Sequence, residues 1–290
     1  MKLSHIIKLM RPHQYIKNSF IFIPLFFALQ ITNLELLTYA SIAFVAFSLS
    51  ASAIYILNDY FDIEEDRQHP KKKYRPLASG DINKKQAIII MFFLLLIGIS
   101  IMSLLTVSAT LILLTYVLMN IVYSLWLKHI AILDVTTIAI GFVLRLFIGS
   151  AVTGIYLSMW IVIMTFLLAL FMALAKRRDD ILIYMNTGTK MRKVIDGYNL
   201  KFIDGAMMIM ASVVIVSYTL YTTSKEVISR VDSGEFLYLT TLFVILGIMR
   251  YMQITFVFEN SGSPSEIILK DRFIQSTLVC WILSFIWILY

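Results

Sequence analysis

Three aspartates, Asp59, Asp62 and Asp66, follow a long apolar run at spacings of three and four residues. On a helix these spacings place the three carboxylates on one face, where they repel one another unless a cation neutralises them. Magnesium takes a few carboxylate oxygens and completes its shell with water and substrate phosphates. Asn58 precedes the aspartates, and seven basic residues follow them between Arg67 and Lys85. This pattern predicts a magnesium–diphosphate site and disfavours a solvated acidic loop.

A second charged segment opens with Lys176, Arg177 and Arg178 and continues with Asp179 and Asp180. A basic cluster after a membrane span is common on the cytoplasmic side, so the cluster alone is weak evidence for function. The functional interpretation is a phosphate clamp, because guanidinium groups pair bidentately with phosphate. The first segment follows the second apolar run and this one follows the sixth. That spacing predicts two similar four-helix units whose loops meet over one cavity.

Two ionisable residues, Asp134 and Arg145, interrupt one apolar run. Such residues are costly in a membrane span and usually line a cavity. They project from the same face of the expected helix, but about 16 Å apart at 1.5 Å per residue, which argues against a direct ion pair. Arg145 is therefore a candidate for binding a deep anionic group. No zinc site is expected, because no histidine has ligand-like neighbours in the sequence: His5, His13, His69 and His129.

The composition decides which class of protein must position these residues. Of 290 residues, 59% are hydrophobic and only 15% are charged, and the mean hydropathy is +0.83. A soluble domain has about 45–50% apolar and about 25% charged residues. The composition excludes a soluble enzyme, a disordered chain and a secreted disulfide scaffold, since Cys280 is the single cysteine. The net charge of +7 lies between apolar runs, so a membrane protein is indicated and a nucleic-acid partner is not.

The apolar runs predict an all-α integral membrane protein with nine transmembrane helices around a central cavity capped by cytoplasmic loops, because a spanning helix needs about 20 apolar residues. The run Gln86–Leu127 is long enough for two spans and is expected to turn near residues 106–110. The other expected spans are Asn18–Leu34, Leu36–Asn58, Ile130–Thr153, Ser158–Ala175, Gly205–Ser224, Phe236–Phe258 and Phe273–Tyr290.

Basic residues gather in the alternate connections, which places the N-terminus and both charged segments in the cytoplasm and the C-terminus outside, in the plasma membrane. Residues 1–12 are expected to form an amphipathic helix at the membrane interface, not a signal peptide. The whole chain, 1–290, is interpreted as one membrane domain with active-site loops at 59–85 and 176–202, in contact with membrane lipids.

The sequence Asn58-Asp59-x-x-Asp62-x-x-x-Asp66 resembles the NDxxDxxxD signature of the UbiA-type prenyltransferase superfamily. The resemblance covers nearly the whole chain. Members are nine-helix membrane enzymes with two cytoplasmic Asp-rich loops. The resemblance implies Mg²⁺ held by Asp59, Asp62 and Asp66 and gripping the diphosphate of an activated donor.

A narrower resemblance points to the polyprenyl-phosphate (decaprenyl-phosphate) 5-phosphoribosyltransferase branch. Residues 11–18, RPHQYIKN, resemble its RPxQWxKN opening, and residues 69–76, HPKKKYRP, resemble its HPxKxxRP stretch. The segments around Lys128, Arg145 and Asp180 are also similar to that branch. Ordinary prenyltransferases carry DxxxD in the second loop, but here Ile183 follows Asp179 at that spacing and Tyr184 follows Asp180. Compared with those enzymes, the second loop lacks one row of carboxylates and carries basic residues in its place, which suits a donor with an extra phosphate.

The resemblance implies transfer of 5-phosphoribosyl from phosphoribosyl diphosphate to a polyprenyl phosphate, with release of diphosphate. Asn58 would orient the diphosphate. The candidates for the ribose 5-phosphate and the acceptor phosphate are Lys17, Lys73, Arg75, Arg177 and Arg178, with Arg145 and Asp180 as further substrate contacts. One alternative is transfer of an isoprenyl group from a polyprenyl diphosphate to an aromatic acceptor. A third interpretation is a transporter or lipid-carrier protein without catalysis.

Overall fold

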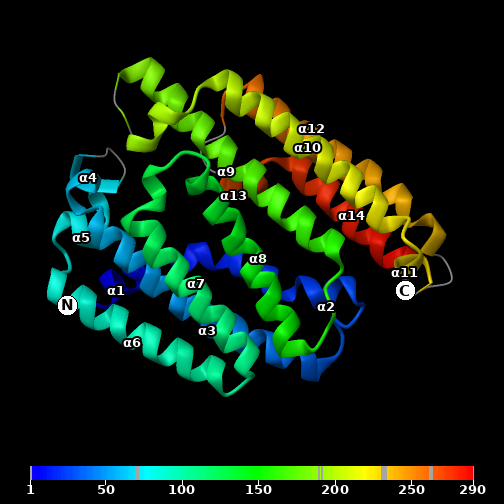
Figure 1. The fold of residues 1–290 in the computed structure, drawn as a ribbon, viewed down its shortest axis with the longest axis horizontal. Coiled ribbons are helices and arrows are strands. Elements are labelled where there is room, and N and C mark those ends of the chain that lie inside the picture. Colours follow the sequence, from blue (N-terminus) through cyan, green and yellow to red (C-terminus); the bar gives the residue numbers. More distant parts are fainter. Residues whose placement is uncertain are drawn as a thin grey trace. The chain divides into compact units, whose positions relative to one another are not determined.

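The computed structural model describes residues 2–68, 72–188, 190, 192–229, 234–260 and 264–289. Within these residues every regular element is a helix (Figure 1), which confirms the all-α prediction. The chain divides into two compact units. Unit 1 comprises Met1–Lys128 and Ile140–Leu157, and unit 2 comprises His129–Ala139 and Ser158–Tyr290. Helix α8 (Leu133–Thr153) contributes its first turns to unit 2 and the remainder to unit 1.

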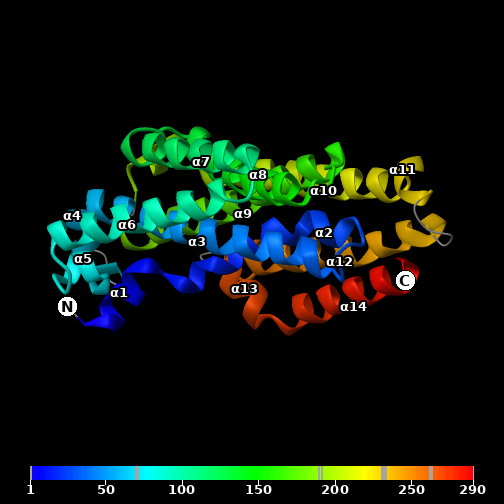
Figure 2. The same ribbon diagram turned by 90° about the horizontal axis from the view of Figure 1, so that it is seen from below.

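Unit 1 is built around one long buried helix, α3, with α6 and α7 packed against it (Figures 1 and 2). The short elements α1, α4 and α5 gather at the end of α3 where the aspartates lie. The elements are α1 (Leu3–Met10), η1 (Pro12–Phe22), α2 (Ile23–Phe27), α3 (Leu34–Phe61), α4 (Ile63–Gln68), η2 (Lys72–Tyr74), α5 (Pro76–Ser79), α6 (Lys84–Ser103), α7 (Val107–Leu125) and η3 (Leu127–His129), where η marks a 3₁₀ helix.

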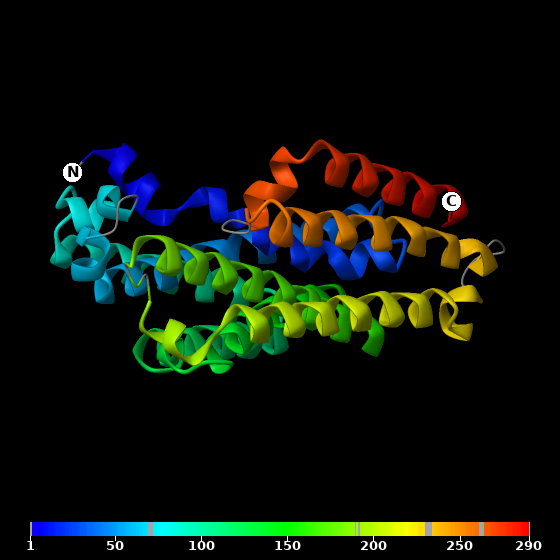
Figure 3. The ribbon, with the colours of Figure 1, turned by 90° about the horizontal axis from the view of Figure 1, so that it is seen from above.

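Unit 2 pairs α9 with α10 and α12 with α14, and both pairs run side by side in Figure 3. Its elements are α9 (Met159–Thr187), η4 (Lys193–Gly197), α10 (Leu200–Thr222), α11 (Lys225–Ile228), η5 (Gly234–Thr240), α12 (Thr241–Phe256), α13 (Pro264–Lys270) and α14 (Arg272–Leu289). A continuous apolar core that includes Phe171, Ile203, Met207 and Ile254 holds these helices together.

Polar N-caps fix where several helices begin. Asn83 forms a capping box with Gln86, so α6 starts directly after the charged loop. Thr106 caps α7 by accepting from the amide of Ala109 at 3.1 Å, which places the turn between α6 and α7 close to the predicted one. Asn33, Ser158 and Asn199 cap three further long helices, α3, α9 and α10.

Small residues let the backbones in unit 1 approach closely. A Cβ on Gly98 of α6 would lie 2.4 Å from Ser50 Oγ and 2.7 Å from the Ala46 carbonyl of α3. A Cβ on Gly149 of α8 would lie 2.1 Å from the Ile21 carbonyl of η1. Close approach at small residues is the usual way in which helices pack inside membranes, where the hydrophobic effect no longer drives association.

The 3₁₀ geometry of η1 matches the three-residue spacing of the residues that contact its neighbours. Tyr15, Asn18 and Ile21 lie on one face, because a 3₁₀ helix has three residues per turn. Tyr15 Oη is 2.8 Å from Ser52 Oγ, and Asn18 Nδ2 donates to Ser48 Oγ at 2.9 Å, so this face is pinned to α3. The Ile21 carbonyl lies against Gly149. Lys17 does not belong to this face, so its side chain is not tied to α3 by these contacts.

Seven helices in the described part of the chain are long and apolar enough to cross a membrane: α3, α6, α7, α8, α9, α10 and the continuous η5–α12. Helix α14 is apolar but shorter. Where the sequence predicted a first span, Asn18–Leu34, the structure has η1, α2 and a turn. The multi-pass membrane architecture is confirmed, while nine spans, the central cavity and a single 1–290 domain stay predictions. Helix α1 forms within residues 1–12, with Leu9 buried and Leu3 and Ile7 exposed.

The contact between η1 and α8 can be tested with Gly149→Ala. The added methyl group would overlap the Ile21 carbonyl, and overpacking of this kind costs about 1–3 kcal/mol. We expect a lower apparent Tm in thermal unfolding of the detergent-solubilised protein. Gly205→Ala in α10 is the control, because nothing lies within 4 Å of that added methyl and alanine favours helix. An unchanged Tm for Gly149→Ala would contradict this packing.

Candidate functional site

The three predicted aspartates lie at the junction of α3 and α4. Asp59 is in the last turn of α3, Asp62 lies between the helices, and Asp66 is in α4. The Asp62 amide donates to the Asn58 carbonyl at 3.0 Å and the Asp66 amide to the Asp62 carbonyl at 2.8 Å, so the chain stays nearly helical across the break. Asp59 and Asp66 are 1% and 2% exposed, whereas Asp62 is half-buried. Buried carboxylates require a partner of opposite charge.

Arg75 bridges the two buried carboxylates. Its Nη1 lies 3.0 Å from Asp59 Oδ1 and 2.6 Å from Asp66 Oδ2. Arg75 is placed there as the residue before Pro76, which starts the short helix α5. Lys72 Nζ is 4.0 Å from the other oxygen of Asp66. Asp59 and Asp66 therefore converge on one cationic nitrogen, as they would on a shared metal ion.

Asp59 has a second partner, Arg11, which the sequence interpretation did not select. Arg11 Nη2 forms an ion pair with Asp59 Oδ1, and its guanidinium lies 5.6 Å from the centre of the Tyr55 ring. Arg11 is the single residue between α1 and η1 and has a left-handed backbone, with φ of 56° and ψ of 57°. Its position in the RPHQYIKN stretch was the available signal, but sequence alone did not show the partner.

Asp62 points to different partners. Lys128 Nζ lies 2.5 Å from Asp62 Oδ1, and Asn58 Nδ2 donates to Asp62 Oδ2 at 3.0 Å. Lys128 was also missed as a site residue. Among the residues that the structure describes, no three His, Cys, Asp or Glu side chains form a ready-made metal cluster. The pair Asp59 and Asp66 still suits magnesium, which is bound through one or two carboxylates plus substrate phosphates.

Arg145 is a buried cation that has no ion pair with a carboxylate among the described residues. It is 5% exposed, in the middle of α8. Nε donates to Asn18 Oδ1 at 2.9 Å, Nη1 to the Gly141 carbonyl at 2.7 Å and Nη2 to Tyr116 Oη at 3.4 Å. Three aromatic rings surround the guanidinium, those of Phe47, Tyr116 and Phe142, with centroids 4.7–5.2 Å away. Among the described residues, the Arg145 guanidinium therefore contacts only neutral groups.

Lys17 on η1 lies near Arg145 and Arg11. Burial, followed by repulsion from Arg145 and then from Arg11, lowers the pKa of Lys17 to about 8. No carboxylate in the described part of the chain forms an ion pair with it. Lys17 and Arg145 together are thus an unneutralised cationic pair beside Arg11, an arrangement that favours an anion.

Lys73 is not drawn into this site. It is exposed in η2, and its Nζ lies 5.2 Å from the centre of the Tyr74 ring. The neighbouring Lys72 contacts Asp66 instead. Of the HPKKKYRP stretch, His69, Pro70 and Lys71 lie outside the described residues.

In unit 2, Arg177 and Arg178 have internal partners. Arg177, 2% exposed, lies between Asp134 Oδ2 at 2.5 Å and Asp180 Oδ2 at 2.9 Å. Arg178 Nε donates to Asp204 at 2.8 Å, and its Nη1 donates to the Thr255 carbonyl at 2.8 Å. These pairs fix the charged end of α9 to its neighbours.

Asp134 joins this unit 2 network through both oxygens. Tyr198 Oη donates to Asp134 Oδ1 at 2.6 Å and accepts from the Ile132 amide at 2.6 Å. Burial, and then the bond to Asp134, raises the pKa of the Tyr198 hydroxyl. Because Asp134 pairs with Arg177, it is not the partner of Arg145, as the sequence spacing indicated. Asp180 also contacts Arg192 Nε at 3.3 Å.

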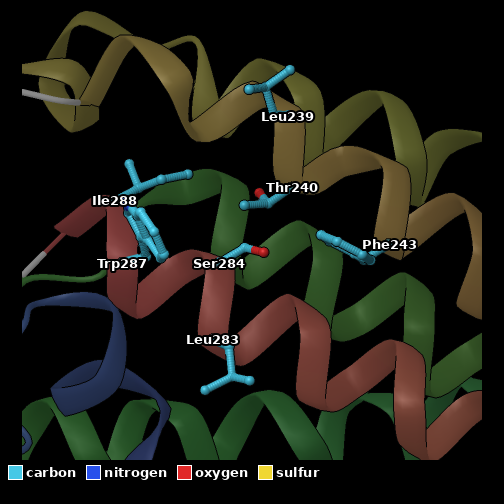
Figure 4. A pocket seen from close by; sticks show the side chains of 7 residues that line it. All are labelled: Leu239, Thr240, Phe243, Leu283, Ser284, Trp287 and Ile288. Atoms are coloured by element: carbon cyan, nitrogen blue, oxygen red, sulfur yellow. The ribbon is translucent and has the colours of Figure 1, made fainter.

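Unit 2 also has an apolar groove of about 280 Å³ between η5–α12 and α14 (Figure 4). Its lining residues are Leu239, Thr240, Phe243, Leu283, Ser284, Trp287 and Ile288. Figure 4 shows Thr240 and Ser284 as its two polar side chains. None of these residues carries a charge, so the groove is unsuited to a diphosphate.

Comparison with known proteins agrees with these observations. A family described as the UbiA prenyltransferase family matches residues 19–277. The decaprenyl-phosphate phosphoribosyltransferase of Corynebacterium glutamicum is 30% identical over 288 residues, covering 98% of this chain and 86% of that protein. The decaprenyl-phosphate phosphoribosyltransferase of Mycolicibacterium smegmatis is also 30% identical, covering 96% of this chain and 90% of that protein.

A solved structure has the same fold. It is that of a UbiA homolog from Archaeoglobus fulgidus bound to GPP and Mg²⁺, which aligns with a TM-score of 0.73 at 17% identity. The alignment covers 98% of this chain and 99% of that one. At this level of identity the likeness establishes the fold.

Asp134→Ala tests whether the unit 2 network is structural. The substitution leaves Arg177 buried without one of its carboxylates, and breaking a buried pair on one side costs about 3–5 kcal/mol. We expect a marked loss of thermal stability, measured by unfolding in detergent. Asp196→Ala is the control, because Asp196 forms an exposed pair with Lys190, worth about 0–1 kcal/mol. Equal effects for the two variants would contradict a structural role for Asp134.

Proposed function

The chain belongs to the UbiA prenyltransferase family and is a membrane transferase, and on that basis we propose that it transfers 5-phosphoribosyl from phosphoribosyl diphosphate to a polyprenyl phosphate, releasing diphosphate. Support for this reaction comes from the relatives named decaprenyl-phosphate phosphoribosyltransferase, which match nearly the full chain. An enzyme is established at the family level, so the interpretation as a non-catalytic transporter is set aside.

The observation that carries the proposal is the pair of buried carboxylates that share one cation. Asp59 and Asp66 both contact Arg75 Nη1, and Asp62 stands one turn from each. We propose that these three residues hold Mg²⁺ together with the donor diphosphate; a homologous fold is known with Mg²⁺ and a prenyl diphosphate bound. When bound, the metal neutralises the charge that develops on the departing diphosphate.

The residues around the aspartate row, which comprises Asp59, Asp62 and Asp66, bind and orient the donor. Asn58 and Lys128 hold Asp62 in place. Arg75 and Lys72 contact Asp66, so a phosphate bound beside Asp66 would be within their reach. Loss of diphosphate leaves positive charge at the anomeric carbon of the ribose. The acceptor phosphate is already an anion and can attack this carbon without a strong general base. The reaction therefore needs positioning and charge more than acid–base groups.

We assign the acceptor phosphate to Lys17 and Arg145. Neither cation forms an ion pair with a carboxylate among the described residues, and Arg145 is buried in mid-helix, where a bound anion would offset the cost of its charge. Arg145 donates three hydrogen bonds to neutral groups, which leaves part of its guanidinium for an anion.

Arg177, Arg178, Asp180 and Lys73 stay predicted substrate contacts. The first three already have internal partners, so a phosphate would have to displace a carboxylate or carbonyl. Lys17 and Arg145, which form no such ion pair among the described residues, are the stronger candidates for the acceptor phosphate for this reason. For localisation we propose the plasma membrane, with the N-terminus and the aspartate row in the cytoplasm and the C-terminus outside.

The alternative function is transfer of an isoprenyl group to an aromatic acceptor, which membership of the family supports in general terms. The same carboxylates would then bind an isoprenyl diphosphate. The unneutralised pair Lys17 and Arg145 favours a phosphorylated acceptor over an aromatic ring. The two functions differ in their products and can be separated directly.

The reaction is tested by mass spectrometry of lipids after incubating purified protein with Mg²⁺, polyprenyl phosphate and phosphoribosyl diphosphate. We expect a phosphoribosylated lipid that disappears with EDTA. Asp59→Asn, which keeps the shape of the side chain, should lower turnover at least about 100-fold in protein shown by circular dichroism to be folded, because charge stabilisation of this kind is worth about 10²–10³ in rate. Glu64→Gln is the control, since Glu64 is exposed and pairs with Arg67. A prenylated aromatic product from isoprenyl diphosphate and 4-hydroxybenzoate would instead establish the alternative.

The acceptor assignment predicts a dependence on pH. Because the pKa of Lys17 is about 8, the side chain is charged below that pH and loses its charge above it. We expect the KM for polyprenyl phosphate to rise above about pH 8, while Lys17→Arg, which stays protonated, should keep a flat KM up to about pH 9.5. Lys8→Arg on the exposed face of α1 is the control and should keep the wild-type profile. An unaltered alkaline profile in Lys17→Arg would remove Lys17 from the acceptor site.

A further inference from the structure

We propose that Arg11 is a diphosphate ligand that neutralises Asp59 in the free enzyme and exchanges this carboxylate for the donor diphosphate when metal and donor bind together. The inference rests on the proposed function of the aspartate row, but it requires only that the donor be a diphosphate. It therefore holds for either donor considered above.

The charges around the row favour such an exchange. Three carboxylates, those of Asp59, Asp62 and Asp66, lie within 4.0 Å of four cations, which are Arg11, Lys72, Arg75 and Lys128. The negative charge of the three aspartates is therefore already exceeded by the positive charge of these four side chains. A divalent cation alone would have to displace one of these half-buried cations and leave it without a counter-charge, which is unfavourable. A diphosphate that arrives with the metal supplies that counter-charge.

Arg11 is the cation best placed to move. Arg75 bridges two carboxylates and lies at the start of α5, whereas Arg11 contacts one oxygen of one carboxylate. The described structure gives the rest of its guanidinium no other hydrogen-bond partner. A guanidinium released from Asp59 can bind phosphate through two parallel N–H···O hydrogen bonds, a planar fork that a lysine ammonium does not offer.

The backbone at Arg11 supports a functional role. Arg11 adopts the left-handed region between α1 and η1 without being glycine, a conformation that costs about 1–2 kcal/mol. Such strain persists when the surroundings require the side chain in one place, and it is common at ligand sites. Tyr55, whose ring lies beside the guanidinium, would support the side chain in both positions.

Binding of Mn²⁺ by the solubilised full-length protein, followed by electron paramagnetic resonance with and without inorganic diphosphate, tests the exchange. In the wild type we expect weak Mn²⁺ binding that tightens at least about tenfold when diphosphate is present. In Arg11→Ala the Mn²⁺ affinity without diphosphate should increase, because Asp59 loses a competing cation. The tightening by diphosphate should shrink, because the diphosphate loses a ligand. Arg11→Lys should lie between the two.

Arg67→Ala is the matched control, since Arg67 follows Asp66 directly in α4 but pairs with Glu64 and the Ala78 carbonyl. It should keep the wild-type Mn²⁺ affinity and coupling. Weaker binding of Mn²⁺ alone by Arg11→Ala, or coupling equal to wild type, would overturn the proposal. If Arg11→Ala does not fold, the same comparison is made with Arg11→Lys, for which unchanged coupling is the contrary result.

This outcome is separable from that of the proposed function. If the coupling depends on Arg11 but no phosphoribosylated lipid forms, the role of Arg11 stands and the substrate assignment fails. If the lipid product forms but Arg11→Ala binds Mn²⁺ and diphosphate as the wild type does, the function stands and the role of Arg11 is refuted.

Discussion

Neutralisation of buried aspartates is the constraint on which unit 1 depends. Asp59 and Asp66 are almost fully buried at the junction of α3 and α4, and buried carboxylates are tolerated only with partners. Their partners come from segments far apart in sequence: Arg11 precedes η1 and Arg75 precedes α5. The ion pairs therefore tie the amphipathic N-terminal helix and the charged loop to the same point of α3. The groups that we propose to bind a diphosphate are also those that hold the end of the helix in place.

The second constraint is the burial of Arg145. The cost of a cation in mid-helix is reduced by Asn18, by the Gly141 carbonyl and by three aromatic rings, and by no carboxylate in the part of the chain that the structure describes. Asn18 contacts both Arg145 and Ser48, and so it joins η1, α3 and α8 through one side chain. This arrangement keeps a positive charge available while the surrounding polar groups remain satisfied. In unit 2 the buried cation is stabilised in another way, because Arg177 is neutralised by Asp134 and Asp180.

Sequence alone predicted those features that depend on local spacing. The apolar runs predicted the long helices, and the i, i+3, i+7 aspartates predicted a charged face at the end of one of them. Pairing across long separations could not be predicted: Arg11 and Asp59 are 48 residues apart, and Asp134 and Arg177 are 43 apart. The break at Asp62 was also missed, although it turns one carboxylate toward Lys128. Helical spacing describes a continuous helix and contains no information on where a helix ends against its neighbours.

The 3₁₀ conformation of η1 has a consequence for its pairing with α3. A 3₁₀ helix rises about 2.0 Å per residue, against 1.5 Å in an α-helix. Three residues of η1 therefore cover about 6 Å, the same distance as four residues of α3. Tyr15 and Asn18, three residues apart, can for this reason meet Ser52 and Ser48, which lie four residues apart on α3. One turn of η1 thus matches about one turn of α3 in length, so contacts between the two helices can repeat from turn to turn.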